Sequence, residues 1–176
     1  MILNSLERFF MNQPLRTSSV EYYLKKIRFG KVGLTAGSLE QKKILEVGCG
    51  SGIWTEALLK HYDVKEVHAF DIDKKMVDLA YRRLSRYIPG KLLLSMGDVT
   101  DIDERNGSVD VAFDIAILHH VEDWQRAIRE IARVLLPGGV FFFEEVNKKG
   151  LEGWFNRTFF RHPTDNRFST EETDGR

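Results

Sequence analysis

The chain has 176 residues, 43% of them hydrophobic and 30% charged, and this composition predicts one globular domain rather than a disordered chain. Lys plus Arg and Asp plus Glu both number 26, so the zero formal net charge gives no electrostatic reason to expect a nucleic-acid partner or an anionic membrane surface. The single cysteine, Cys49, excludes an internal disulfide, and no run of about 18 apolar residues predicts a membrane span, so we expect a cytoplasmic protein.

Residues 1–37 are predicted to form an N-terminal helical cap. Apolar residues recur at helical spacing on both sides of Pro14. Two amphipathic helices ahead of a sheet can pack over its open end or form a lid over a ligand, and both interpretations stay open.

A strand, a glycine-rich turn and a helix follow. Lys43 to Val47 is a short apolar run, the turn contains Gly48, Gly50 and Gly52, and Ile53 to His61 has the apolar face of a helix. The glycines allow positive φ and close approach of a ligand to the backbone, and the helix N-terminus leaves N–H groups that can hold an anion. This pattern predicts the first crossover unit of an α/β domain.

The acid before the turn narrows the ligand class. The dinucleotide fingerprint requires a third glycine where this chain has Ile53. Glu46 would repel a pyrophosphate by roughly 1 kcal/mol or more near a surface. It suits a ligand that has an ammonium or sulfonium group and no phosphate, and S-adenosylmethionine (SAM) is such a ligand. The alternative is an ordinary turn with a surface glutamate.

A second strand, Glu66 to Asp73, ends in acids. Asp71 lies 23 residues after Gly48 (71 − 48), at the end of that strand, where a carboxylate can accept both hydroxyls of a ribose. Asp73 is interpreted as the cap of a helix from Lys74 to Ile88.

The third and fourth strands bring two more acids to the same edge of the sheet. Lys91 to Met96 precedes Asp98, which can accept the exocyclic amine of an adenine. Val109 to Leu118 is predicted as a buried fourth strand, and Asp114 within it points inward, which is costly for a charge without a partner; a nearby cation would be one.

A helix and a fifth strand complete the predicted alternation of strands and helices. Val121 to Leu136 is amphipathic and capped by Asp123, residues 137–139 (Pro-Gly-Gly) break it, and Val140 to Glu144 is a strand. Strands alternating with helices predict parallel pairing and right-handed crossovers.

Three stretches of this pattern, with Gly97-Asp98, resemble the class I SAM-dependent methyltransferases, in particular the small-molecule branch that is ubiquinone/menaquinone methyltransferase-like. They are Ile44 to Gly52, Phe70 to Ala80 and Val109 to Gly139, and the match covers about residues 42–146. The resemblance implies a Rossmann-like three-layer α/β/α sandwich, here a SAM-binding core over residues 38–147 with strand order 3-2-1-4-5.

The resemblance also implies roles for individual residues. Glu46, Gly48 and Gly50 would contact the methionine part of SAM, Asp71 the ribose, and Asp98 and Val99 the adenine, with Ile72 packed on its ring. Leu118 would contact the ligand through its backbone, and Cys49, Gly52 and Met76 complete the cofactor-binding set, although a packing role suits Cys49 in a turn that needs a small side chain. Asp114 would lie nearest the transferred methyl group.

The adjacent His119 and His120 are further catalytic candidates. Either can be a general base with a pKa near neutral, or a hydrogen-bonded structural residue of that loop. Neighbouring histidines do not easily bind one ion together and no third ligand is evident, so we expect no metal site. Methyl transfer depends mostly on positioning, and no base is obligatory.

The end of the sequence departs from the family pattern. The family continues to seven strands, ordered 3-2-1-4-5-7-6, whereas residues 148–176 predict only an incomplete C-terminal segment, so strands 6 and 7 are expected to be missing. The exposed edge of the fifth strand then favours a dimer that covers it. Trp154, Phe155, Phe159 and Phe160 allow a peripheral membrane or lipid contact, although core packing is the commoner use of such a stripe.

These observations predict a SAM-dependent methyltransferase that acts on a small-molecule or lipid acceptor and releases S-adenosylhomocysteine. The alternatives are a SAM-binding truncated protein without transferase activity and a nicotinamide-dependent oxidoreductase. A nucleic-acid substrate is not expected without a basic stripe. The acceptor atom is not specified by the sequence.

Overall fold

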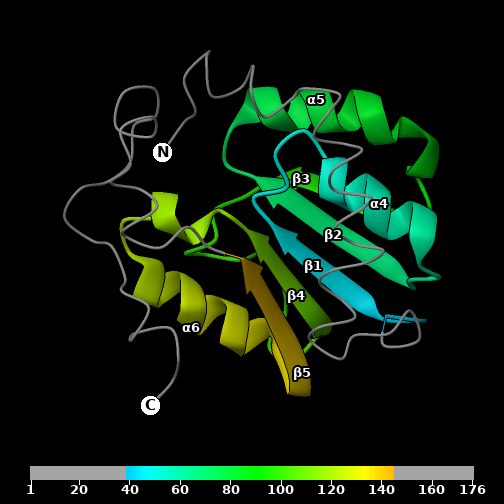
Figure 1. Cartoon of the computed structure of the whole chain (residues 1–176). Coiled ribbons are helices and arrows are strands. Elements are labelled where there is room, and N and C mark those ends of the chain that lie inside the picture. The colour runs from blue at the N-terminus through cyan, green and yellow to red at the C-terminus, as the bar shows by residue number, and fades with distance from the viewer. Residues whose placement is uncertain (1–38, 145–176) are drawn as a thin grey trace.

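The computed structural model describes residues 39–144, which form a five-stranded parallel sheet flanked by helices (Figure 1). The strand order is β3-β2-β1-β4-β5. The strands are β1 Lys43–Val47, β2 Glu66–Asp71, β3 Leu92–Met96, β4 Val109–Ile115 and β5 Leu135–Glu144. The predicted fold class and strand order are therefore confirmed.

Helices cover both faces of the sheet. Figure 1 shows α4 (Ile53–His61) and α5 (Lys74–Leu84) on one face and α6 (Trp124–Val134) on the other. Each side has its own apolar core, so the layers are α/β/α.

Strand β1 shows why the sheet is buried from both sides. Ile44 belongs to the core beneath α4 and α5, whereas Leu45 and Val47 belong to the core beneath α6. Successive side chains of a strand point to opposite faces, so a strand covered on both sides is apolar at nearly every position.

Two helix caps agree with the prediction. The side chain of Asp73 accepts a hydrogen bond from the N–H of Lys75 at the start of α5. Asp123 does the same for the N–H of Arg126 at the start of α6. Both carboxylates satisfy N–H groups that the first helical turn leaves without an intrahelical partner.

Several predicted boundaries were wrong. The second strand ends at Asp71, and the helix predicted to reach Ile88 ends at Leu84, where the chain tightens into a 3-10 turn at Ser85–Tyr87. Strand β4 ends at Ile115 rather than Leu118, because Ala116 adopts a left-handed backbone with φ 62°. A second 3-10 turn follows at Leu118–His120.

The connection between α6 and β5 also differs. The helix ends at Val134, and β5 begins at Leu135, so residues 137–139 lie inside the strand rather than between helix and strand. Strand β4 pairs Val109 with Leu135 and Val111 with Val140, with a register shift between the two pairs. Proline has no N–H for the ladder, so this stretch is accommodated as an irregularity.

Two predicted segments lie outside the described residues: the helical cap at residues 1–37 and the C-terminal segment at residues 148–176. The prediction that strands 6 and 7 are missing concerns the same undescribed part of the chain and stays a prediction. Within residues 39–144, no helix is long and apolar enough to span a membrane.

Candidate functional site

The predicted site residues follow the carboxyl ends of neighbouring parallel strands and therefore meet at one edge of the sheet. In Figure 1 the arrowheads of β1, β2 and β4 point toward the same side, where the turn between β1 and α4 lies. Open α/β sheets bind ligands at this edge.

The glycine turn is shaped by close packing as well as by backbone conformation. Gly48 has φ 65° and Gly52 has φ 75°. A Cβ on Gly48 would lie 1.8 Å from Cδ1 of Ile117, and a Cβ on Gly52 would lie 2.6 Å from Cδ1 of Leu84 on α5. The absence of a side chain at Gly48 therefore lets Ile117, in the loop after β4, pack against the turn. The absence of one at Gly52 lets Leu84 of α5 do the same.

Asp71 connects this turn to the end of β2. Its Oδ2 accepts a hydrogen bond from the N–H of Gly50 at 2.8 Å, and its Oδ1 accepts one from the N–H of Asp73 at 2.8 Å. The residue is 8% exposed, and burial raises the pKa of its carboxyl, although the two N–H donors oppose that shift. Each carboxylate oxygen has a further lone pair, so this arrangement is compatible with additional hydroxyl donors.

Glu46 lies behind the turn, where the sequence predicted a charged acid. It is 3% exposed, and the hydroxyl of Thr55 donates a hydrogen bond to its Oε2 at 2.7 Å. Burial raises the pKa of Glu46 to about 8, opposed by the Thr55 hydrogen bond and assisted by the charge of Asp71. At neutral pH the isolated protein therefore holds Glu46 mostly in its neutral form, and a nearby cation would favour its ionised form.

Cys49 and Met76 are buried beneath the turn. Cys49 is 6% exposed, and burial, then the charges of Glu46 and Asp71, raise the pKa of its thiol well above the ordinary value. Met76 is fully buried, with its Cε 3.4 Å from where a Cβ on Gly50 would lie. Both side chains pack against the turn, and neither lines the pocket described next.

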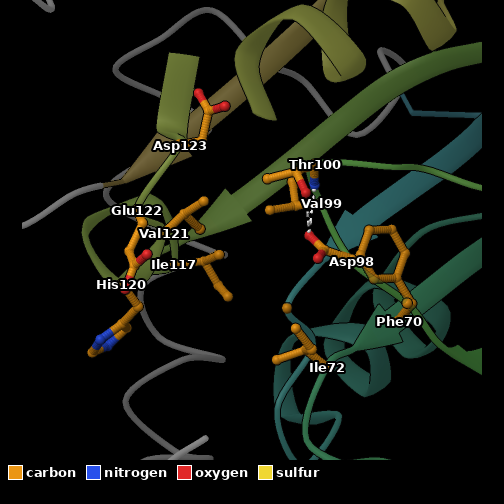
Figure 2. Close-up of a pocket in the computed structure, with 12 residues that line it drawn as sticks. Phe70, Ile72, Asp98, Val99, Thr100, Ile117, His120, Val121, Glu122 and Asp123 are labelled. Atoms are coloured by element: carbon orange, nitrogen blue, oxygen red, sulfur yellow. Dashed lines mark hydrogen bonds between the residues drawn. The ribbon is translucent and has the colours of Figure 1, made fainter. Parts of the chain in front are cut away.

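A pocket of about 610 Å³ opens beside the turn. Figure 2 shows two walls that face each other across it. The β2–β3 wall comprises Phe70, Ile72, Gly97, Asp98, Val99 and Thr100, and the post-β4 wall comprises Ile117, His120, Val121, Glu122 and Asp123, with Gly48 between them in the turn.

The β2–β3 wall combines an apolar surface with an acid. Ile72 is 45% exposed, which leaves its side chain accessible to a flat ring. Oδ1 of Asp98 accepts hydrogen bonds from the N–H and the hydroxyl of Thr100, both at 2.8 Å. Its Oδ2 takes no hydrogen bond from residues 39–144 and is available to an amine donor.

The post-β4 wall depends on a turn that the sequence did not reveal. Asp114 is fully buried, and its Oδ1 accepts a hydrogen bond from the N–H of Ile117 at 2.9 Å. With the left-handed Ala116, this bond places the Ile117 side chain against Gly48. The sequence predicted that this buried acid needs a partner, such as a cation, and the main-chain N–H of Ile117 is one.

The two histidines differ in their access to the pocket. His119 is 6% exposed, and its ring centroid lies 4.0 Å from that of His120. His120 lines the pocket, and Figure 2 shows its imidazole at the rim of the post-β4 wall, directed away from Asp98. Leu118 is 3% exposed and packs in the α6-side core. Within residues 39–144, no group of three His, Cys, Asp or Glu side chains is arranged to hold a metal ion.

Five predicted site residues line the pocket: Gly48, Ile72, Asp98, Val99 and His120. Glu46, Gly50 and Asp71 lie at the turn beside it, and the other predicted residues lie outside its lining. Sequence reasoning missed Ile117, because the fourth strand was extended through the turn at Ala116, and Glu122, because the next helix was predicted to begin at Val121 rather than at Trp124. The rule that ligands bind beyond strand carboxyl ends would have found both had β4 been ended at Ile115 and the helix begun at Trp124.

The comparison with known families gives one match over most of this region. A family described as "Methyltransferase domain" matches residues 45–143. This range contains the glycine turn, both walls of the pocket and all but one residue of β5.

Individual relatives agree with the family match. "Ubiquinone biosynthesis O-methyltransferase" of Coxiella burnetii is 30% identical over 111 residues, which are 63% of this chain and 46% of that protein. The chain thus spans about half the length of such curated relatives.

Among solved structures, an S-adenosylmethionine-dependent methyltransferase from Mesorhizobium loti is 25% identical, with a TM-score of 0.56, over 62% of this chain and 49% of that one. The [4+2]-cyclase SpnF is 26% identical, with a TM-score of 0.59, over 62% of this chain and 40% of that one.

Proposed function

Because the chain belongs to the class I SAM-dependent methyltransferases, we propose that it binds SAM at the glycine turn and transfers the methyl group to a small-molecule acceptor in the adjoining pocket. Methyl transfer from SAM is the chemistry of the family. Our proposal concerns which residues of this chain bind SAM and which class of molecule accepts the methyl group.

The observation that supports this proposal best is that the site offers acidic side chains and no basic ones. Glu46, Asp71 and Asp98 lie along the turn and the β2–β3 wall, and the pocket lining formed by residues 39–144 contains no Lys or Arg. A pyrophosphate would meet acids and no cation, which argues against a nicotinamide dinucleotide. A ligand with an ammonium, a sulfonium and a ribose suits these side chains.

Each part of SAM has a candidate partner. Glu46, with Gly48 and Gly50, would hold the methionine part, and Asp71 the ribose. Asp98 and the Val99 backbone would contact the adenine, whose ring would pack on Ile72. When bound, SAM supplies an electrophilic methyl carbon: an acceptor lone pair forms the new bond while the S–C electrons pass to sulfur, leaving S-adenosylhomocysteine.

We infer that the acceptor atom is a hydroxyl oxygen of a small molecule. The names of the relatives, O-methyltransferases of ubiquinone biosynthesis and of a fungus, support this class. A hydroxyl acceptor loses its proton during transfer, and His120 is the one predicted catalytic residue that lines the pocket. Asp114 and His119 are buried, and we expect them to shape the post-β4 wall.

Calorimetric titration with SAM and S-adenosylhomocysteine tests the cofactor site. We expect Asp71→Ala to weaken binding by about 10- to 100-fold, because it removes the acceptor of the Gly50 N–H and the proposed ribose contact. Asp78→Ala is the matched control, since Asp78 is an exposed acid on α5 that pairs with Lys74. Equal affinity in wild type and Asp71→Ala would refute the proposed site.

Transfer itself is tested with SAM carrying a labelled methyl group and a panel of phenolic acceptors. We expect label in the acceptor for wild type and a decrease of about 100-fold for His120→Ala, in the range of general-base contributions. Binding of SAM without transfer to any member of the panel would favour the alternative of a SAM-binding protein without this activity.

A further inference from the structure

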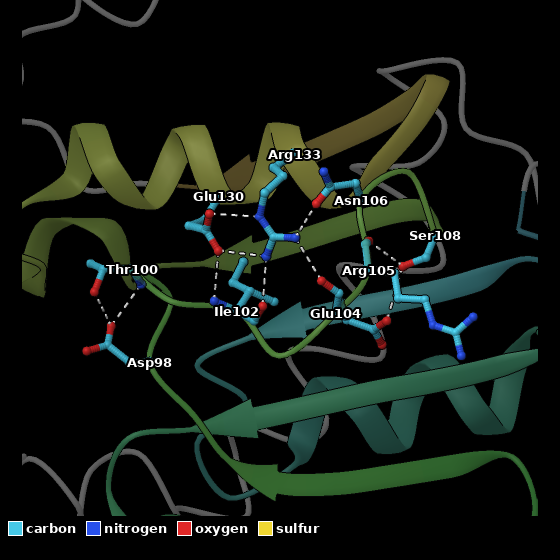
Figure 3. Close-up of polar contacts among 9 residues, drawn as sticks. All are labelled: Asp98, Thr100, Ile102, Glu104, Arg105, Asn106, Ser108, Glu130 and Arg133. Atoms are coloured by element: carbon cyan, nitrogen blue, oxygen red, sulfur yellow. Dashed lines mark hydrogen bonds and ion pairs between the residues drawn. The ribbon is translucent and has the colours of Figure 1, made fainter.

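The connection from β3 to β4, residues 97–108, contains no helix, yet it supplies Asp98, Val99 and Thr100 to the β2–β3 wall. It packs on the α6 side of the sheet, where Val99 and Ile102 are buried in the core beneath α6. An irregular segment needs partners for its backbone polar groups. Figure 3 shows side chains of α6 among these partners.

Arg133 on α6 binds this segment at three points. Its Nη2 donates to the carbonyl oxygen of Ile102 at 2.8 Å, and its Nη1 donates to the carbonyl oxygen of Glu104 at 2.8 Å and to Oδ1 of Asn106 at 2.7 Å. A planar guanidinium can serve several acceptors in fixed directions, which an ammonium cannot reproduce.

Glu130, one helical turn earlier, orients Arg133 and adds a contact of its own. Its carboxylate accepts hydrogen bonds from Nε of Arg133 at 2.8 Å and from Nη2 at 2.7 Å. Its Oε2 also accepts the N–H of Ile102 at 3.0 Å. Both backbone groups of Ile102 are therefore bound to this pair of side chains on α6 (Figure 3).

Ile102 is connected to the pocket wall by one tight turn. The N–H of Asp101 donates to the carbonyl oxygen of Asp98 at 3.0 Å, and Oδ1 of Asp98 accepts both donors of Thr100. A displacement of Ile102 would pass through this turn to Asp98 and Val99.

The far end of the segment has a separate anchor. The carboxylate of Glu104 accepts hydrogen bonds from Lys43 at 3.1 Å and Ser108 at 3.1 Å, and lies 3.0 Å from Nδ1 of His68. Loss of the α6 contacts would therefore leave residues 104–108 attached to β1 and β2, and release mainly residues 98–102. This is the part that forms the wall.

We propose that Arg133 and Glu130 are positioning residues: they hold Asp98 and Val99 where these residues can contact the adenine of the methyl donor. The inference rests on the proposed function, because it assigns the β2–β3 wall to the nucleoside. Neither residue lines the pocket, and both act through Ile102.

Two measurements on Arg133→Lys and Glu130→Gln test this role. The first is the ratio of the dissociation constants of S-adenosylhomocysteine and S-inosylhomocysteine. The adenosyl compound has the exocyclic amine from which Asp98 would accept a hydrogen bond, and the inosyl compound has an oxygen in its place. The second is the hydrogen-exchange rate of the Thr100 and Asp101 amides in the protein without ligand. Asp110→Asn is the matched control, since the Asp110 carboxylate likewise accepts hydrogen bonds from a main-chain N–H, that of Lys43, and from a cationic side chain, that of Lys42.

We expect the wild type to prefer the adenosyl compound, and both variants to lose roughly tenfold of that preference while Asp110→Asn keeps it. Exchange at Thr100 and Asp101 should accelerate in both variants and not in the control. A preference and exchange rates that stay at wild-type values would overturn the inference, even if thermal stability falls. If the wild type binds neither compound, the proposed function fails, and unchanged exchange in the variants would independently refute the positioning role.

Discussion

Binding of SAM or S-adenosylhomocysteine should release a proton from Glu46. In the free protein this carboxyl is 3% exposed with a pKa of about 8, so at pH 7 about nine molecules in ten carry the proton (1/(1 + 10⁻¹) is about 0.9). A ligand ammonium beside the carboxylate stabilises its ionised form. If the pKa returns to its ordinary value of 4.5, almost no proton remains at pH 7. The expected release is thus about 0.9 proton per ligand at pH 7 and about 0.5 at pH 8.

Calorimetry in two buffers measures this release directly. The difference between the binding enthalpies in Tris and in phosphate at the same pH, divided by the difference in their ionisation enthalpies, gives the number of protons transferred to the buffer. Because release accompanies binding, affinity should rise about eightfold from pH 6.5 to pH 7.5. Glu46→Gln has no proton to release at this position, so its enthalpy should differ less between the two buffers, and its affinity should change less with pH, than in the wild type.

One result would refute this reasoning. If the wild type binds with an enthalpy independent of the buffer, either Glu46 is already ionised in the free protein or the ligand's cation does not approach it. Glu46→Gln then separates the two cases. Wild-type affinity in that variant would show that the cation lies elsewhere, and weakened binding would show that Glu46 is ionised before the ligand arrives.

Three further predictions do not depend on a ligand. Because the folded protein holds the proton of Glu46 above its ordinary pKa, the wild type should lose stability relative to Glu46→Gln as pH rises from about 4.5 to about 8, by at most about 1.4 kcal/mol per pH unit, measured by urea unfolding. Gly52→Ala should destabilise by about 2–4 kcal/mol, because its Cβ meets Leu84 at 2.6 Å, whereas Gly138→Ala, with similar φ and nothing within 4 Å, should cost about 1 kcal/mol; equal losses would refute the packing argument. Cys49 should react with thiol reagents at pH 8 only as fast as the protein opens, and rapid labelling of the folded protein would contradict its burial.

Much of the fold could be predicted from the sequence because its signals are local. The alternation of apolar runs with helical periodicity indicated a parallel sheet, and the glycines after Val47 indicated the turn that begins α4. Asp73 and Asp123 were identified as helix caps, because a cap depends only on the residues beside it. The places of Asp71 and Asp98 at one edge followed from parallel pairing alone.

The tertiary structure decided what depends on contacts between distant segments. Glu46 was predicted as a charged acid, yet its pKa is raised because the folded chain closes around it, and the sequence does not show how much water a side chain loses. The turn at Ala116 was missed because Asp114 and Ile117 stabilise it against the apolar pattern of a continuing strand.

Arg133 lies in an amphipathic helix, and nothing in the sequence singles it out; only the folded chain brings it to residues 102–106, about 30 positions earlier in the sequence. Sequence by itself therefore determined the parallel sheet and the edge at which its acids gather, because periodicity and chirality are properties of neighbouring residues, and the resemblance to a known family supplied the strand order. Burial, protonation and the support of the pocket wall were decided by tertiary structure, because each arises from side chains that only folding brings into contact.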